Sequence, residues 1–196
     1  MTRPIGLRDV LNLIDYERVR EKLRGRVIDL KRRRRVEVGP YLSFVFENRD
    51  TLLFQIQEMC RVERIVDDAK VREEIDVYNA LLPGRGELSA TLFIEIADED
   101  QIQPMLDRFR GIDTGRHVWL EIAGGPSVPG VFETGHSDEE KGKLAAVHFV
   151  RFAFSPEATG RFRTSAVDLV VDHPAARART RLSEETKAEL LADLEA

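Results

Sequence analysis

The sequence predicts an α+β fold: a mostly antiparallel sheet of about six strands, a long N-terminal helix, two or three further helices and a C-terminal helix. Two observations predict it. Apolar residues recur at steps of three and four mainly towards the two ends of the chain, whereas strand-like runs fill the region from 88 to 171. The expected strands also follow one another through short polar loops, which favours antiparallel pairing.

The first expected element is a helix from about Leu7 to Arg33. Gly25 weakens its middle and indicates a bend or close packing. A bent or interrupted strand is expected next, between Val36 and Phe46. The apolar stripe of the helix consists of Tyr16, Val19, Leu23, Val27 and Leu30.

Two more helices are expected in the first half. Asn48 or Asp50 can cap the first of them, although a hairpin turn at Asn48-Arg49-Asp50 is the alternative. The second follows Asp67-Asp68 and ends at Pro83-Gly84.

The second half is interpreted as strands over 88–96, 117–122, 128–132, 145–154 and 165–171, with a short helix after Asp98 and a charged loop from Ser137 to Lys143. Residues 173–181, rich in Ala and Arg, are interpreted as an exposed linker, and Ser183 caps the last helix. One domain is expected, helix-rich over 1–86 and strand-rich over 87–172, with the linker and C-terminal helix over 173–196.

The composition, with 42% hydrophobic and 33% charged residues, is typical of a globular protein with a charged surface. No run approaches the roughly 18 apolar residues that span a bilayer, and the N-terminus lacks the apolar stretch of a secretory signal. Cys60 is the only cysteine, which excludes an intrachain disulfide and a multi-cysteine metal site. We therefore expect a cytoplasmic protein without membrane association.

The net charge of −5 is unevenly distributed: residues 1–35 carry +7 and the remainder carries −12. The run Lys31-Arg32-Arg33-Arg34-Arg35 could release counterions from a nucleic acid. It lies near the end of the expected helix, however, where cations complement the helix dipole. We therefore expect a structural or acidic-partner role and do not expect nucleic-acid binding.

The segment from Phe46 to Arg64 mixes charged and amide side chains with Phe, Leu, Ile and Met. This mixture suits neither a solvated helix face nor a plain core, so it predicts a polar network fixed against the core. Arginine forks in a recessed site could bind an anionic group or a partner carboxylate, and an ordinary salt-bridge network is the competing interpretation. The candidate ligand- or partner-binding residues are Glu47, Arg49, Gln57, Glu58, Arg61 and Arg64.

Helical spacing places Glu58 beside Arg61, and Gln57 beside Arg61 and Arg64. We expect Glu58, Arg61 and Arg64 to order their helix against the strand that contains Phe44 and Phe46.

No nucleophile–base arrangement, phosphate loop or metal-ligand spacing is present, so no cofactor is expected and the sequence favours a non-enzymatic role. Cys60 is interpreted as a small buried residue rather than a redox centre. The alternative is a metal-dependent enzyme or metal-binding protein, because carboxylates and histidines from distant segments can assemble a site. Its candidate ligands are Glu47, Glu58 and His148.

Several segments resemble a bacterial family known only as domain of unknown function 3501, and the resemblance extends over nearly the whole chain. They include Val36-Glu37-Val38-Gly39-Pro40, Phe46-Glu47-Asn48-Arg49-Asp50-Thr51, Gln55-Ile56-Gln57-Glu58-Met59 and Tyr78-Asn79-Ala80-Leu81-Leu82-Pro83. The resemblance brings no activity or catalytic residue. Genes of such proteins often neighbour those of rubrerythrin and of heterodisulfide-reductase-like iron–sulfur proteins. The resemblance therefore implies an accessory role in a redox or peroxide-protection pathway.

These inferences combine into the hypothesis of a non-catalytic binding or accessory protein that works with an iron–sulfur or rubrerythrin-like protein partner. A homodimer is also expected, because both terminal helices carry apolar stripes and an antiparallel sheet can leave an open edge.

Overall fold

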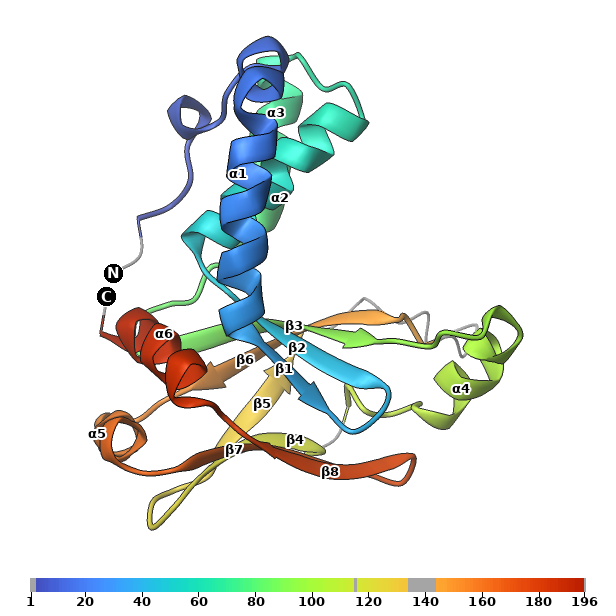
Figure 1. Ribbon diagram of the computed structural model, residues 1–196, viewed down its shortest axis with the longest axis vertical. Helices are drawn as coiled ribbons and strands as arrows, with labels where there is room; N and C mark the ends of the chain where they lie inside the picture. Colours follow the sequence, from blue (N-terminus) through green and yellow to red (C-terminus); the bar gives the residue numbers. More distant parts are fainter. Residues whose placement is uncertain (1–2, 115, 134–143, 196) are drawn as a thin grey trace.

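The computed structural model describes residues 3–114, 116–133 and 144–195. It shows an eight-stranded antiparallel sheet, curled into a barrel, from which an arm of three helices extends (Figure 1). The predicted α+β class with antiparallel pairing is confirmed, and the predicted number of about six strands is corrected to eight. The expected charged loop from Ser137 to Lys143 lies outside the described residues.

The sheet has the strand order β1-β2-β3-β6-β5-β4-β7-β8. The two strands at the ends of this order approach each other, because the hydroxyl of Thr180 on β8 donates a 2.6 Å hydrogen bond to the carbonyl of Glu37 on β1. The barrel is therefore nearly closed. Its strands are β1 (Arg35–Val38), β2 (Leu42–Glu47), β3 (Glu87–Ile94), β4 (Val118–Ile122), β5 (Val128–Phe132), β6 (Val147–Ala153), β7 (Val167–His173) and β8 (Ala176–Arg181).

Several of the expected helix starts are confirmed by side-chain caps: Asn48, Asp67, Asp98 and Ser183 each accept hydrogen bonds from the backbone of the first turn. The helix between β6 and β7 was not anticipated from the sequence. The α-helices are α1 (Leu13–Arg34), α2 (Arg49–Val62), α3 (Asp68–Asn79), α4 (Ile102–Arg108), α5 (Pro156–Thr164) and α6 (Glu184–Leu194), with 3₁₀ turns η1 (Leu7–Asp9) and η2 (Glu99–Gln101).

The long N-terminal helix begins later than predicted. Residues 7–9 form the separate turn η1, and α1 starts after Asn12, whose side chain accepts a hydrogen bond from the backbone of Asp15. The helix is continuous through Gly25, where a Cβ would meet no atom within 4 Å. The expected close packing at this glycine is therefore wrong.

Two predicted segments prove to be strands of a different kind. The bent strand between Val36 and Phe46 is a hairpin of β1 and β2, whose turn uses Gly39 with a φ of 68°. The predicted linker over 173–181 contains the end of β7 and all of β8. The arginines of β8 point outward, where Asp168 and Asp172 on β7 bind them, so the strand forms despite its charged composition.

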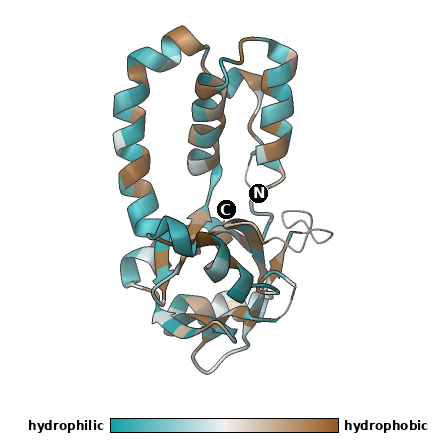
Figure 2. Ribbon diagram, turned by 90° about the vertical axis from the view of Figure 1, so that its right-hand side faces the viewer, coloured by the Kyte–Doolittle hydropathy of each residue, from teal (hydrophilic) through white to brown (hydrophobic). Residues whose placement is uncertain are grey.

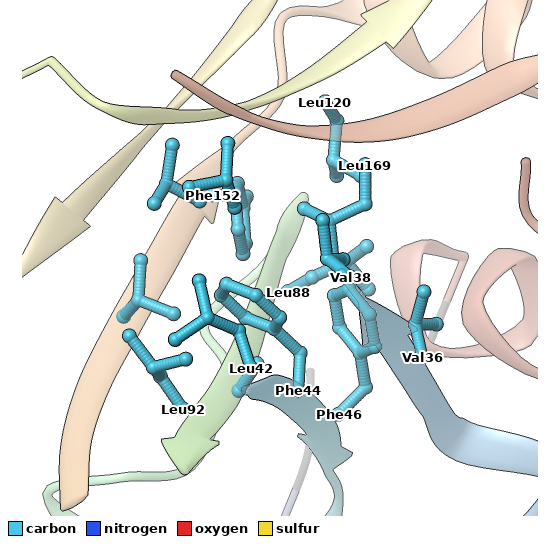
Figure 3. Close-up of a cluster of buried hydrophobic side chains, with 14 of the residues drawn as sticks. Val36, Val38, Leu42, Phe44, Phe46, Leu88, Leu92, Leu120, Phe152 and Leu169 are labelled. Atoms are coloured by element: carbon cyan, nitrogen blue, oxygen red, sulfur yellow. The ribbon is translucent and has the colours of Figure 1, made fainter. Parts of the chain in front are cut away.

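The barrel interior is filled by apolar side chains from every part of the sheet (Figure 3). Phe44 and Phe46 of β2 point inward beside Leu88, Phe152 and residues of the opposite strands. Because side chains alternate along a strand, Leu42 shares the inner face, whereas Ser43, Val45 and Glu47 lie on the outer face. This outer face carries polar groups of the junction with the arm.

The buried guanidinium of Arg34, at the end of α1, joins the arm to the barrel. Its Nε donates a 2.8 Å hydrogen bond to the carbonyl of Phe46, and Nη2 donates to the carbonyl of Glu47 at 3.3 Å. The same group forms ion pairs with Asp193 and, at 3.5 Å, with Glu189, both on α6. One side chain therefore connects α1, β2 and α6.

Replacing Arg34 by Ala should lower the free energy of unfolding by about 3–5 kcal/mol, because it leaves two buried carbonyls and two partly buried carboxylates without their donor. Arg32→Ala is the matched control, since Arg32 is exposed on the same helical turn, and it should change stability by less than about 0.5 kcal/mol. Urea unfolding followed by circular dichroism measures both. Equal effects of the two substitutions would contradict this role for Arg34.

Candidate functional site

The three helices of the arm lie side by side, with α2 between α1 and α3, and the N-terminal segment runs along them (Figure 2). The arm has its own apolar core, separate from that of the barrel. Its buried members come from the N-terminal segment, α2, α3 and the turn after α3: Ile5, Leu52, Ile56, Cys60, Val71, Ile75 and Leu81. None of them belongs to α1, whose buried side chains Tyr16 and Val27 lie outside this cluster.

Two side-chain amides hold the N-terminal segment against α2 and α3. Asn79 accepts a hydrogen bond from the backbone N–H of Ile5 and donates one to its carbonyl, each 2.9 Å long. Gln57 makes the same pair of bonds with Leu11, at 2.7 and 3.1 Å. The buried candidate Gln57 therefore orders the chain itself, with both its amide oxygen and its amide nitrogen bonded to Leu11.

The candidate Glu58 binds α1 to α2. Both of its oxygens accept from the guanidinium of Arg20, at 2.8 and 2.9 Å, and Oε1 also accepts from the hydroxyl of Tyr16 at 2.7 Å. Arg61 lies 3.4 Å from the same carboxylate. The predicted pairing of Glu58 with Arg61 is confirmed. The predicted neighbour of this network was wrong: the network joins α2 to α1, and not to the strand with Phe44 and Phe46.

This network shifts the ionisation of its members. The hydrogen bonds from Arg20, followed by those from Tyr16 and Arg61, lower the pKa of Glu58 to about 2, against the opposing effect of burial. Burial and the hydrogen bond to Glu58 raise the pKa of Tyr16. Glu58 is thus held as a carboxylate with its oxygens occupied, which favours a structural role.

Arg49 and Glu47 lie at the base of the arm. Arg49 donates to the carbonyl of Arg3 at 3.1 Å and pairs with Asp9 at 2.7 Å, so it anchors the N-terminal segment. The buried carboxylate of Glu47 accepts from Thr51 at 2.5 Å, from Thr91 at 2.7 Å and from Gln55 at 3.2 Å. These bonds fasten the start of α2 to β3.

Arg64 lies apart from the other candidates. It follows α2 with a φ of 54°, the left-handed conformation that glycine usually supplies at a helix end. The N–H of Ile65 closes the turn by donating to the carbonyl of Cys60 at 2.8 Å. The side chain of Arg64 is exposed and makes no hydrogen bond or ion pair with another described residue. It is therefore available to a partner.

The alternative metal ligands Glu47, Glu58 and His148 are not brought together. His148 pairs in register with Leu92 and lies inside the barrel, where its Nε2 is 2.8 Å from the carbonyl of Ala145, whereas Glu47 lies on the outer face. Glu58 lies in the arm, where it bonds Arg20 between α1 and α2. Within the described ranges, no group of three or more His, Cys, Asp and Glu side chains could hold a metal ion.

An open groove separates α1 from α2 and has a volume of about 500 Å³. Its floor is apolar, with Leu23, Val27 and Leu30 from α1 facing Leu53 and Phe54 from α2. Charged residues line its edges: Arg26, Arg33, Asp9 and Asp50. The volume lies within the range of ligand sites, and the mixture of an apolar floor with polar edges suits an amphipathic occupant.

Sequence reasoning found part of this site. It identified the stripe of Tyr16, Leu23 and Leu30 and the carboxylate of Glu58, but it missed Arg20, the main partner of Glu58, and the groove beside it. The signal for Arg20 was present, because it lies one helical turn after Tyr16. The packing of α1 against α2 could not be deduced from either helix alone.

Comparisons with known proteins support the same family as the sequence. The chain matches the family model described as "Protein of unknown function (DUF3501)" over residues 4–194. The crystal structure of a protein of unknown function from Burkholderia pseudomallei matches this structure with a TM-score of 0.91 and 30% sequence identity, covering 98% of this chain and 100% of the other. No curated protein matches the chain.

No helix in the described parts of the chain has the length and apolar character needed to cross a membrane.

The stability of the arm should depend on pH through Glu58. Its pKa is depressed from 4.5 to about 2 in the folded state, so the stabilisation is present above pH 4.5 and is lost as the pH falls towards 2. Urea unfolding at several pH values should show this loss in the wild-type protein and a shallower dependence in Glu58→Gln. The same pH dependence in both proteins would contradict the assignment.

Arg64→Gly should raise the free energy of unfolding by about 0.5–1 kcal/mol, because glycine adopts a positive φ without the steric cost of a side chain. Glu63→Gly is the control, since Glu63 has a φ of −83° and gains nothing from glycine. Thermal unfolding measures the difference. A loss of stability in Arg64→Gly would show that the arginine side chain stabilises the helix end.

Proposed function

This chain belongs to the family described as "Protein of unknown function (DUF3501)", and from its structure we propose that it is a non-catalytic accessory protein that binds a protein partner through the helical arm. The six candidate residues divide into two groups under this proposal. Glu47, Arg49, Gln57, Glu58 and Arg61 hold the arm in shape. Arg64 lies at its far end and contacts the partner.

The observation that carries the proposal is the exposure of apolar side chains on the arm. Ten large apolar side chains of the described residues are strongly exposed, and seven of them belong to the arm or its N-terminal segment. The start of α1 and the end of α2 lie together at the far end of the arm (Figure 1). This end of the chain path carries Ile14, Val62 and Val66, which are 70%, 62% and 78% exposed. Clustered exposed apolar residues with a free arginine are typical of protein interfaces.

The expected partner is an iron–sulfur or rubrerythrin-like protein of a redox or peroxide-protection pathway in the cytoplasm. This part of the proposal rests on the family resemblance. The state of Cys60 agrees with it, because the thiol is 1% exposed and burial raises its pKa, which disfavours the reactive thiolate. Under this proposal, the partner carries the redox centre.

Co-purification at moderate salt tests the proposal. The tagged wild-type chain, expressed in its native host, should enrich a redox protein that then binds the purified chain. A variant with Ile14, Val62 and Val66 changed to Ser should enrich the redox protein at least tenfold less than the wild type does. The matched control changes Val131 and Val147 of the barrel to Ser, since these side chains are also exposed, and it should retain the partner. Equal enrichment by both variants, or no redox protein, would contradict the proposal.

A further inference from the structure

The two grooves of the arm differ in how the chain uses them. The groove between α2 and α3 is filled by the N-terminal segment, which buries Ile5 and is held by Asn79 and Gln57. The groove between α1 and α2 is closed at one end by the bonds of Tyr16 and Arg20 to Glu58, and no described segment fills the part beside residues 23–33 of α1. The arm thus contains one occupied groove and one unoccupied groove on the same central helix.

The α1 wall of the open groove has the spacing of a helix–helix contact. The residues of its open part recur at steps of three and four: Leu23, Arg26, Leu30 and Arg33. Residues with this spacing stay on one face of a helix, and side chains of a second helix can pack between them. Leu53 and Phe54 on α2 supply the opposite wall. Leu23 and Leu30 are half-buried, so the chain itself covers this seam incompletely.

The cations of the groove lie on its α1 wall, whereas Asp9 and Asp50 lie on its other edges, so the charges of α1 indicate which residues of a bound helix face this wall. Arg33 already binds a carboxylate of a neighbouring helix, because its Nε donates to Glu189 of α6 at 2.7 Å. Arg26 lies seven residues earlier on the same line of α1 and is exposed, and it makes no hydrogen bond or ion pair with any described residue. Lys22, one turn before it, is also exposed and likewise pairs with none of the described residues. The contact between α1 and α6 thus ends where the open groove begins. From there on, the basic side chains of α1 have no acidic partner among the described residues.

We infer that this groove binds an amphipathic helix of the protein partner, with its apolar face on Leu23, Leu30 and Phe54 and a carboxylate on Arg26. The inference rests on the proposed function and specifies the chemistry of the partner. From Leu23 to Arg33 the open wall is about 15 Å long, which corresponds to about three turns of a partner helix. The bound helix adds to the arm in the manner of a helix-in-groove complex.

The test uses a fluorescein-labelled peptide of three heptads, with Leu at the two core positions and Glu at the flanking positions. The matched peptide carries Lys in place of Glu. Fluorescence anisotropy titrations with the full chain should show binding of the acidic peptide at least tenfold tighter than binding of the basic one. The affinity for the acidic peptide should fall as salt is raised.

Arg26→Glu should weaken binding of the acidic peptide at least tenfold, whereas Arg24→Glu should change it less than twofold. Arg24 is the matched control, because it is an exposed arginine on the side of α1 opposite the groove. Equal binding of the two peptides, or equal effects of the two substitutions, would overturn the inference. Sedimentation of the unliganded chain checks the expected homodimer. A dimer that Arg26→Glu dissociates, without peptide binding by the wild type, would assign the groove to a second copy and overturn the inference.

The outcomes separate this inference from the proposed function. If the chain retains a redox partner through Ile14, Val62 and Val66 but does not bind the acidic peptide, the groove inference fails and the proposed function stands. If neither the redox partner nor the peptide binds, both fail.

Discussion

The structure depends on a buried arginine at the junction of its two parts. Arg34 ends the helix α1 inside the molecule, where its guanidinium binds two carbonyls of β2 and two carboxylates of α6. A charge in this position is tolerated only because every contact is polar, and removing one partner leaves the others unsatisfied. The direction of the arm relative to the barrel is therefore determined by a polar constraint rather than by apolar packing alone.

The arm above this junction repeats the same strategy with smaller networks. The Glu58 carboxylate joins α1 to α2, the Gln57 and Asn79 amides hold the N-terminal segment, and Glu47 fastens α2 to the sheet. Together these contacts order a layer of helices with a small apolar core. Side chains that such contacts already hold lose little conformational entropy when a partner binds, which agrees with the proposed role as a docking surface.

Much of the secondary structure could be predicted, because capping residues and apolar periods are local signals. Asn48, Asp67 and Ser183 marked their helices correctly. The strand β8 could not be predicted, since its arginines are stabilised by carboxylates on β7 that pairing brings opposite them. The site was predicted in part for the same reason: Glu58 and Arg61 are neighbours on one helix, whereas Arg20 belongs to another.

The sequence by itself determined the α+β class, the antiparallel pairing, most helix starts, the absence of an intrachain disulfide and the family, since each follows from composition, period or motif. Only the tertiary structure decided that the sheet closes into a barrel, that α1 stands away from it, and that Arg26 faces an open groove. These features depend on contacts between residues far apart in the chain. The spacing of residues along a helix shows which of them share a face, whereas only the packing of the folded chain shows whether that face is covered.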